Sequence, residues 1–327
     1  MPRIKQTTFG FLPAIILLIL PLFSQEHYMM HIFMWVCIYF MLSTSLRFIM
    51  LVNAVNFAHA GFMGVGAYIS AALVIKLGLS FWITFILGGI ASAIFAIFFG
   101  FITLRLKGAY FFLVSFALCE IIRISFSSYQ IKIFGGVNGL IGIPTPNPIF
   151  GLQFKVGGLP LFYLTSLITI IFTFITYLIE KCYWGKVFRC ITESQSLAES
   201  VGINVTKYKL TAFVIGCFIA GIAGSLYASF NGVITPLDFT FRLSLFVLVC
   251  VVFGGREGFF GPALGVAALV AIGEAFRSFA YFEPIIWGAC IIIVLLFAPQ
   301  GLLGFMDRIL VPVIWKFGKS IKRENNI

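Results

Sequence analysis

Long apolar segments recur along the whole chain, and short polar or charged stretches separate them. Each segment is close to the roughly 20 residues that a helix needs to cross the hydrocarbon core of a bilayer. Two segments look short, so we expect about eight to ten membrane helices. The pattern predicts an all-α, polytopic membrane helix bundle that forms a single transmembrane domain over residues 1–327. The predicted spans are residues 10–24, 28–50, 62–79, 82–103, 109–128, 160–179, 210–230, 241–254, 262–281 and 284–299.

Two long polar stretches interrupt the series of apolar segments. Residues 129–160 are rich in glycine and proline and predict a loop on the outer face. Residues 180–209 carry both charge signs and contain the run Glu193–Val201, whose composition favours a helix with one polar face. Gly202 follows this run and can end the helix with a left-handed backbone. We expect this helix to lie along the inner membrane surface and to dock into a groove of a soluble partner. A simple charged connector is the alternative.

Composition supports the membrane assignment. Hydrophobic residues make up 61% of the chain and charged residues 10%, whereas a soluble domain carries about 25% charged residues. The net charge of +11 would suggest nucleic-acid binding in a soluble protein. Here most of the 22 lysines and arginines fall on the cytoplasmic side if the chain begins inside. Both termini are therefore predicted to be cytoplasmic. Leu22-Phe23-Ser24 is a poor cleavage site, so we expect the first apolar segment to be retained as an anchor.

Enzyme and cofactor motifs are missing from the sequence. Gly318-Lys319-Ser320 resembles the end of a P-loop, but that motif needs a glycine where Val313 stands. The three histidines form no H-E-x-x-H motif, and the chain has no G-x-S-x-G motif. The seven cysteines form no C-x-x-C pair. The chain itself therefore should not hydrolyse ATP, and we predict no catalytic residue, no metal and no cofactor of its own. Any ATP hydrolysis would have to occur in a separate protein.

Two acid–base pairs lie within predicted spans. Glu120 precedes Arg123, and Glu274 precedes Arg277, each by three residues. This spacing places both side chains on one helix face, where pairing offsets the cost of a charge in the membrane. We interpret both as structural ion pairs. Contact with a substrate or an external partner is the alternative.

The segment from Asn53 to Gly61 combines two amides and an imidazole, from Asn53, Asn56 and His59, with small residues. Non-helical backbone at membrane depth is tolerated only where it is buried in protein or lines water. Asn53, Asn56, His59 and Gly61 are candidates for a translocation path. The amide and imidazole groups among them can bind the carboxylate and ammonium of a zwitterion. Hydrogen bonding between helices, with glycine allowing close approach, explains them equally well.

The sequence of residues 180–209 also resembles a region of a known protein family. The runs Gly185–Arg189, Ala198–Asn204 and Tyr208–Phe213 are similar to the ATPase-coupling region of LivM proteins, which are permease subunits of branched-chain amino acid ABC importers. Weaker motifs continue the resemblance in order along nearly the whole chain. They are Phe57–Tyr68, Leu104–Phe111, Glu120 with Arg123, Gly135–Pro144, Ala220–Tyr227, Gly254–Gly265 and Pro299–Gly304.

Two departures qualify the resemblance. The general coupling motif of ABC importers begins Glu-Ala-Ala, but Ser196, Leu197 and Ala198 stand at those positions. Only Ala198 and Gly202 fit the motif. In addition, Asn53–His59 is closer to the sister LivH-type subunit, so the place of this chain in a heterodimer stays open.

The resemblance implies an ABC importer permease fold in the bacterial plasma (inner) membrane. It implies a LivH-like permease partner, two cytoplasmic ATPase subunits, and an extracytoplasmic binding protein that docks at residues 129–160. The cargo would be branched-chain or similar hydrophobic amino acids. No residue decides the exact substrate, so a urea or amide importer and an ATPase-independent secondary transporter remain alternatives. The resemblance assigns ATPase coupling to Glu193, Ala198, Glu199, Gly202, Ile203 and Asn204.

Overall fold

The computed structural model describes residues 26–277, with gaps at 107, 129–130, 149–153, 155 and 257, and residues 288, 292, 301, 302 and 304. The predicted first span, residues 10–24, lies outside the described residues, and so does nearly all of the predicted last span. The chain divides into two compact units, one comprising residues 17–248 and the other the remaining residues. Each unit is described by itself, and a single domain over residues 1–327 stays a prediction.

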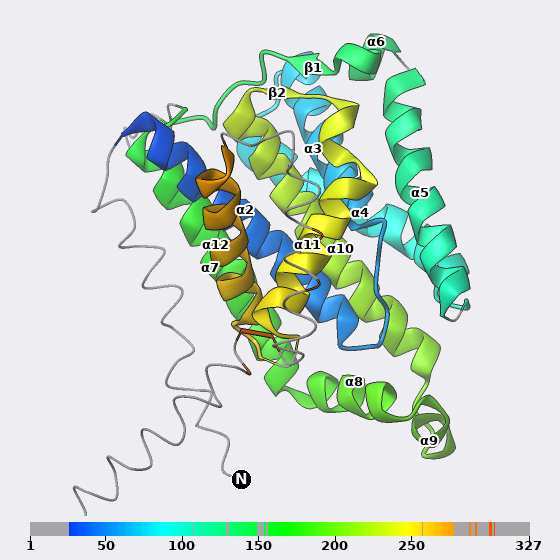
Figure 1. Cartoon of the computed structure of the whole chain (residues 1–327). Helices are drawn as coiled ribbons and strands as arrows, with labels where there is room; N and C mark the ends of the chain where they lie inside the picture. Colours follow the sequence, from blue (N-terminus) through cyan, green and yellow to red (C-terminus); the bar gives the residue numbers. More distant parts are fainter. Residues whose placement is uncertain are drawn as a thin grey trace, which may run out of the picture. The chain divides into compact units, whose positions relative to one another are not determined.

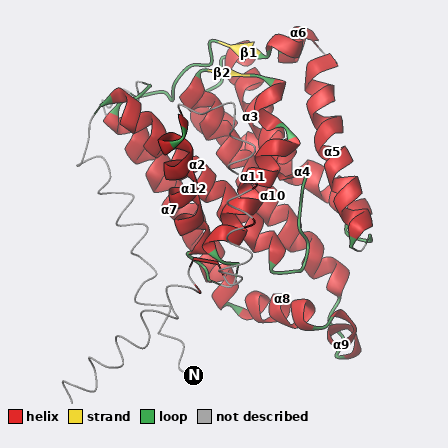
Figure 2. Cartoon of the chain, viewed as in Figure 1, coloured by secondary structure: helices red, strands yellow, loops and turns green. Residues whose placement is uncertain are grey.

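Helices dominate the described residues (Figures 1 and 2). Six are long and apolar enough to cross a membrane, and two further apolar helices are shorter. The six long helices confirm six of the predicted spans, with ends that shift by a few residues, and the two shorter ones coincide with the predicted spans at 241–254 and 262–281. The long helices are α2 (His27–Met50), α3 (His59–Leu77), α4 (Phe81–Thr103), α5 (Ala109–Ser128), α7 (Leu159–Lys181) and α10 (Val205–Asn231), and the shorter ones are α11 (Phe241–Gly254) and α12 (Gly261–Ala275).

Helices α3, α4 and α10 form the centre of the first unit through close backbone packing. A Cβ atom at Gly66 of α3 would overlap the backbone of Gly221 on α10, and one at Gly224 would overlap the carbonyl of Met63. Ser92 of α4 donates a hydrogen bond to the carbonyl of Phe62, with an oxygen–oxygen distance of 2.7 Å. Small residues are the usual contact between membrane helices, because lipid gives no hydrophobic drive for association and packing must supply it.

The membrane-facing side of this unit is apolar. α2 and α10 are mostly buried, whereas α4 and α5 expose large apolar side chains along much of their length. Ile94 and Phe98 of α4, and Tyr110 and Leu113 of α5, are examples. Exposed apolar surface of this extent is unfavourable in water, and it fits contact with lipid or with another membrane protein.

The polar stretch that was predicted as an irregular outer loop contains regular structure. It holds α6 (Ile131–Phe134), a 3₁₀ turn η1 (Gly136–Asn138) and the short strand β1 (Leu140–Ile141). β1 pairs antiparallel with β2 (Val233–Ile234), which follows α10 and precedes a second 3₁₀ turn η2 (Pro236–Phe239). Leu140 lies opposite Ile234, and Ile141 lies opposite Val233. Among the described residues, this two-stranded sheet is a small departure from the predicted all-α fold.

The sheet and residues 180–209 lie far apart within the first unit. β1, β2 and α6 lie at one end of the helices, and the short helices α8 (Tyr183–Glu193) and α9 (Gln195–Ser200) lie at the other (Figure 1). We call these the β1 end and the α8 end. The β1 end is held together by side chains such as Asn147, whose Oδ1 accepts a hydrogen bond of 3.2 Å from the backbone N–H of Phe81 at the start of α4.

Candidate functional site

Residues 180–209 form two short helices joined by a sharp bend. α8 ends at Glu193, and the extended backbone of Ser194 (φ −156°, ψ 111°) separates it from α9. Ser194 caps α9, because its Oγ accepts a hydrogen bond of 3.3 Å from the N–H of Leu197. The predicted single helix over Glu193–Val201 is therefore wrong at its start. A serine that can cap a helix interrupts the run, and Glu193 belongs to the preceding helix.

The other end of α9 closes as the sequence predicts. Gly202 has φ +82°. Its N–H donates to the carbonyl of Glu199 at 3.0 Å, and the N–H of Ile203 donates to the carbonyl of Ala198 at 3.1 Å. These two bonds define a Schellman motif, which satisfies the last carbonyls of the helix. Asn204 then caps α10, since its Oδ1 accepts a hydrogen bond of 3.0 Å from the N–H of Lys207.

A small apolar cluster fixes α9 to its neighbours. Ala198 is buried against Val187 and Ile191 of α8 and Val205 of α10, and Ile203 packs against the same cluster. Of the six predicted coupling residues, Ala198 and Ile203 thus hold the segment together. The other four are exposed: Glu193, Glu199, Gly202 and Asn204.

Two apolar side chains that the sequence analysis did not assign to coupling stand out on the surface of this segment. Leu197 is 66% exposed and Val201 is 68% exposed. They lie four residues apart, at the spacing that puts two side chains on the same face. Their signal in the sequence is two apolar residues within a polar run, at a spacing of four. A small apolar surface with a polar rim is typical of a protein–protein contact.

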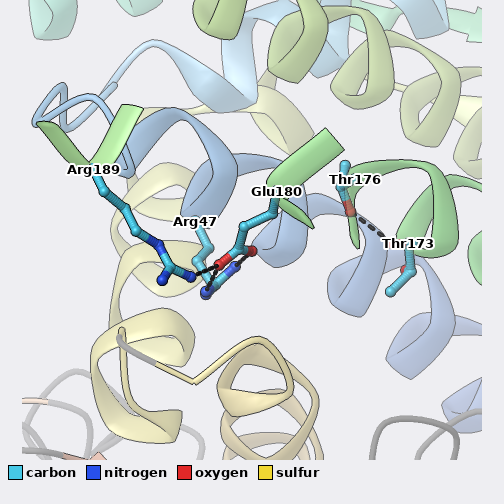
Figure 3. Close-up of polar contacts among 5 residues, drawn as sticks. All are labelled: Arg47, Thr173, Thr176, Glu180 and Arg189. Carbon is cyan, nitrogen blue, oxygen red and sulfur yellow. Dashed lines mark hydrogen bonds and ion pairs between the residues drawn. The ribbon is translucent and has the colours of Figure 1, made fainter. Parts of the chain in front are cut away.

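A buried ion-pair network lies where α2, α7 and α8 meet (Figure 3). Arg47 of α2 is 1% exposed and binds Glu180 of α7 through two contacts, Nη1–Oε2 at 2.9 Å and Nη2–Oε1 at 3.2 Å. Arg189 of α8 binds the same carboxylate at 3.3 Å from its Nη2. Thr176, one turn before Glu180, donates to the carbonyl of Thr173 within α7. The carboxylate of Glu180 thus receives two arginines from two different helices.

The sequence analysis missed this network. By sequence alone, Arg47 is one of the many cations that the positive-inside rule places on the cytoplasmic side. The available signal was Glu180, an acidic residue at the end of an apolar span, but its partner lies 133 residues away in the sequence. Only the folded chain brings Arg47 and Glu180 together.

The segment between α2 and α3 is non-helical and largely buried. His59, at the start of α3, has its Nε2 2.8 Å from Ser45 Oγ and 3.2 Å from the carbonyl oxygen of Leu42. Leu42 lies eight residues before the end of α2, which corresponds to about 12 Å along the helix. Residues 51–58 therefore run back beside α2, and α3 begins well inside the bundle.

The four candidate residues of this segment do not converge on one site. His59 and Asn56 are buried, and Asn56 Oδ1 accepts a hydrogen bond of 3.0 Å from the N–H of Ala58. Asn53 is exposed and has φ +58°, whereas Gly61 faces Ile122 of α5. The contacts of Asn56 and His59 are those of packed helices. A role in the translocation path stays a prediction.

Both acid–base pairs that were expected at i, i+3 spacing form, the first within α5 and the second between α12 and Arg277, two residues after its end. Glu120 and Arg123 are partly exposed, with an Nε–Oε2 distance of 2.7 Å. Glu274 and Arg277 belong to the second unit and are 3.9 Å apart. Neither pair is buried, which suits a stabilising role at a helix surface.

Comparison with known proteins identifies a family to which the chain is similar. The sequence profile of one protein family, described as the permease component of branched-chain amino acid transport systems, matches residues 28–299. The match includes α8, α9, the buried ion-pair network and all eight apolar helices. No solved structure is significantly similar to the chain.

Curated relatives include both kinds of permease. The LivM proteins of the high-affinity branched-chain amino acid transport systems of Salmonella typhimurium and Escherichia coli are 33% and 32% identical, over 75% of this chain and 62% of each relative. The LivH protein of Salmonella typhimurium is 26% identical over 78% of this chain and 87% of its own length. The chain thus aligns with less than two thirds of the length of these LivM proteins.

Proposed function

Because this chain belongs to the family of branched-chain amino acid transport system permease components, we propose that it is the LivM-type permease subunit of an ATP-driven importer. Its cargo is a branched-chain or similar hydrophobic amino acid. The chain is a multi-pass membrane protein, with six described helices long enough to cross a bilayer. The observation that carries the proposal is α9, which presents Leu197 and Val201 to the exterior at one end of the helices.

In this proposal α9 is the contact with a cytoplasmic ATPase. The chain has no P-loop, so the energy of ATP must enter through a contact with another protein. A short helix with two exposed apolar side chains suits insertion into a groove. The Schellman motif and the buried Ala198 make the segment rigid enough to transmit a push. Closure of two ATPase subunits would then displace α8 and α9 together and reorient the membrane helices.

The other partners follow from the same proposal. A LivH-like permease would complete the membrane part, and similarity to both LivM and LivH relatives supports such a pair. An extracytoplasmic binding protein would deliver the amino acid at the β1 end. The position of β1 and α9 at opposite ends of the first unit supports this arrangement (Figure 1). The α8 end and both termini would then be cytoplasmic, in a bacterial plasma membrane.

The test is a pair of charge insertions at matched leucines. Leu197 of α9 and Leu237 of η2 are 66% and 65% exposed, and they lie at opposite ends of the first unit. Leu197→Glu should place a charge in the ATPase groove, so the ATPase subunits should no longer co-purify with the permease and uptake should be lost. Leu237→Glu should leave the ATPase subunits bound. Wild-type ATPase binding and uptake in Leu197→Glu would contradict the proposal.

A further inference from the structure

The three charges of the ion-pair network differ sharply in exposure. Arg47 is 1% exposed and Glu180 is 8% exposed, whereas Arg189 is 57% exposed. Breaking the contact between these two largely buried charges is strongly unfavourable. Arg189 can move away into solvent without such a penalty. The network therefore contains one fixed pair and one releasable attachment.

The fixed pair joins the last turns of two long helices. Arg47 lies in the last turn of α2, and Glu180 is the penultimate residue of α7. Their bidentate geometry fixes orientation as well as distance. At the α8 end, α2 and α7 are therefore expected to move as one body.

The releasable attachment, Arg189, belongs to α8. Two neighbouring contacts also join α8 to the end of α2. Phe188 of α8 packs edge-on against Phe48 of α2, with ring centroids 5.7 Å apart. Thr192 Oγ1 donates a hydrogen bond to the carbonyl of Leu51, the first residue after α2. One side of α8 thus contacts α2 and the start of the segment that returns toward α3.

That segment connects α8 to the interior of the bundle. From Leu51 the chain runs back along α2 to Asn56 and His59, both of which are buried. Ser244 of α11 accepts, through its Oγ, a hydrogen bond of 2.9 Å from the N–H of Ala60 in the first turn of α3. A displacement of α8 would therefore reach the start of α3, and through it α11, by contacts within the first unit.

We propose that Arg189 is a positioning residue that attaches α8 to the Arg47–Glu180 pair, so that movement of α8 is transmitted to α2, to residues 51–58 and to the start of α3. The inference rests on the proposed function, because it takes α8 and α9 to be the part that an ATPase moves. It adds a specific route from that contact to the membrane helices. It also separates the residue that transmits movement, Arg189, from those that contact the ATPase.

The test compares three substitutions on α8 in the complete importer, reconstituted into vesicles with its ATPase subunits and binding protein. Arg189→Gln removes the attachment but leaves the buried pair intact. Arg189→Lys restores a cation that can make the single contact that Arg189 makes. Lys186→Gln is the control, because it removes the same charge from an exposed position of the same helix. The readouts are co-purification of the ATPase subunits and the number of substrate molecules imported per ATP hydrolysed.

Arg189→Gln should keep its ATPase subunits, but its import per ATP should fall about two- to fivefold, the range that an ion pair with one exposed partner supports. Arg189→Lys should recover most of this loss, and Lys186→Gln should match the wild type. An unchanged ratio in Arg189→Gln, or an equal fall in Lys186→Gln, would overturn the inference. Failure of the wild-type importer to couple uptake to ATP would instead overturn the proposed function.

Discussion

At the scale of single residues, Gly202 shows how one backbone conformation sets the shape of a functional segment. Its φ of +82° lies in a region that side chains with a Cβ atom rarely adopt, yet nothing lies within 4 Å of the place where a Cβ would be. The requirement for glycine is therefore conformational and not steric. The left-handed turn directs the chain from α9 into α10.

A valine at this position should disable the segment without unfolding the protein. Gly202→Val imposes a backbone strain of about 1–3 kcal/mol on a short helix, so we expect α9 to shift and uptake to fall strongly. Gly202→Asn should retain far more activity, because asparagine tolerates the left-handed conformation. Uptake assays with immunoblots of the membrane fraction check both variants. Equal uptake in the valine variant and the wild type would contradict this role for Gly202.

At the scale of elements, the packing of α3 against α10 depends on the absence of a side chain at Gly224. A Cβ there would overlap the carbonyl of Met63, which is backbone and cannot move aside. At Gly61, by contrast, a Cβ would lie 3.2 Å from Ile122 Cδ1, the tip of a flexible side chain. The two glycines therefore differ in how well they should tolerate a methyl group.

Gly224→Ala should lower the stability of the permease substantially, by about 1–3 kcal/mol, because overpacking forces the helices apart. Gly61→Ala should cost clearly less. Thermal unfolding of the purified protein in detergent measures both. An unfolding temperature for Gly224→Ala at or above that of Gly61→Ala would show that the close contact of α3 and α10 is not required.

Among the elements, those that depend on local sequence were predictable, and those that depend on distant contacts were not. The eight apolar helices could be located because each depends on a local run of apolar residues, which is visible without the fold. The end of α9 at Gly202 was predictable for the same reason, since the glycine and the helix adjoin. The break at Ser194 was missed, because a serine within a polar run serves equally well inside a connector or as a cap. The pairing of β1 with β2 and of Arg47 with Glu180 joins residues far apart in the chain, and no local pattern reveals it.

In the candidate site too, local features were predictable from the sequence and the features that depend on the fold were not. A short helix within the polar stretch 180–209 was predictable from its composition, and its role in ATPase coupling stays a prediction from the resemblance to LivM proteins. The role of each residue within it was not, because burial decides it. Ala198 and Ile203 turn inward, and Leu197 and Val201 face outward. His59 and Asn56 were ambiguous between a path and helix packing. Their hydrogen bonds in the structure are with α2, with Cys217 of α10 and with the segment's own backbone.

At the scale of the whole molecule, the proposed function places the ATPase contact at the α8 end of the first unit and substrate delivery at the β1 end. The Arg47–Glu180 pair joins α2 to α7, and close backbone contact joins α3 to α10. α9 is the proposed ATPase contact, and the exposed side chains of Leu197 and Val201 form its contact surface. All of this requires the α8 end to face the cytoplasm, where ATP is available.

The most direct test is therefore the accessibility of a single cysteine at position 197. Leu197→Cys is introduced into a chain whose seven native cysteines are replaced, and a membrane-impermeant maleimide is applied to intact cells and to inside-out vesicles. The account predicts labelling in inside-out vesicles, protection when the ATPase subunits are bound, and no labelling in intact cells. Labelling of this cysteine from outside intact cells would contradict the central claim.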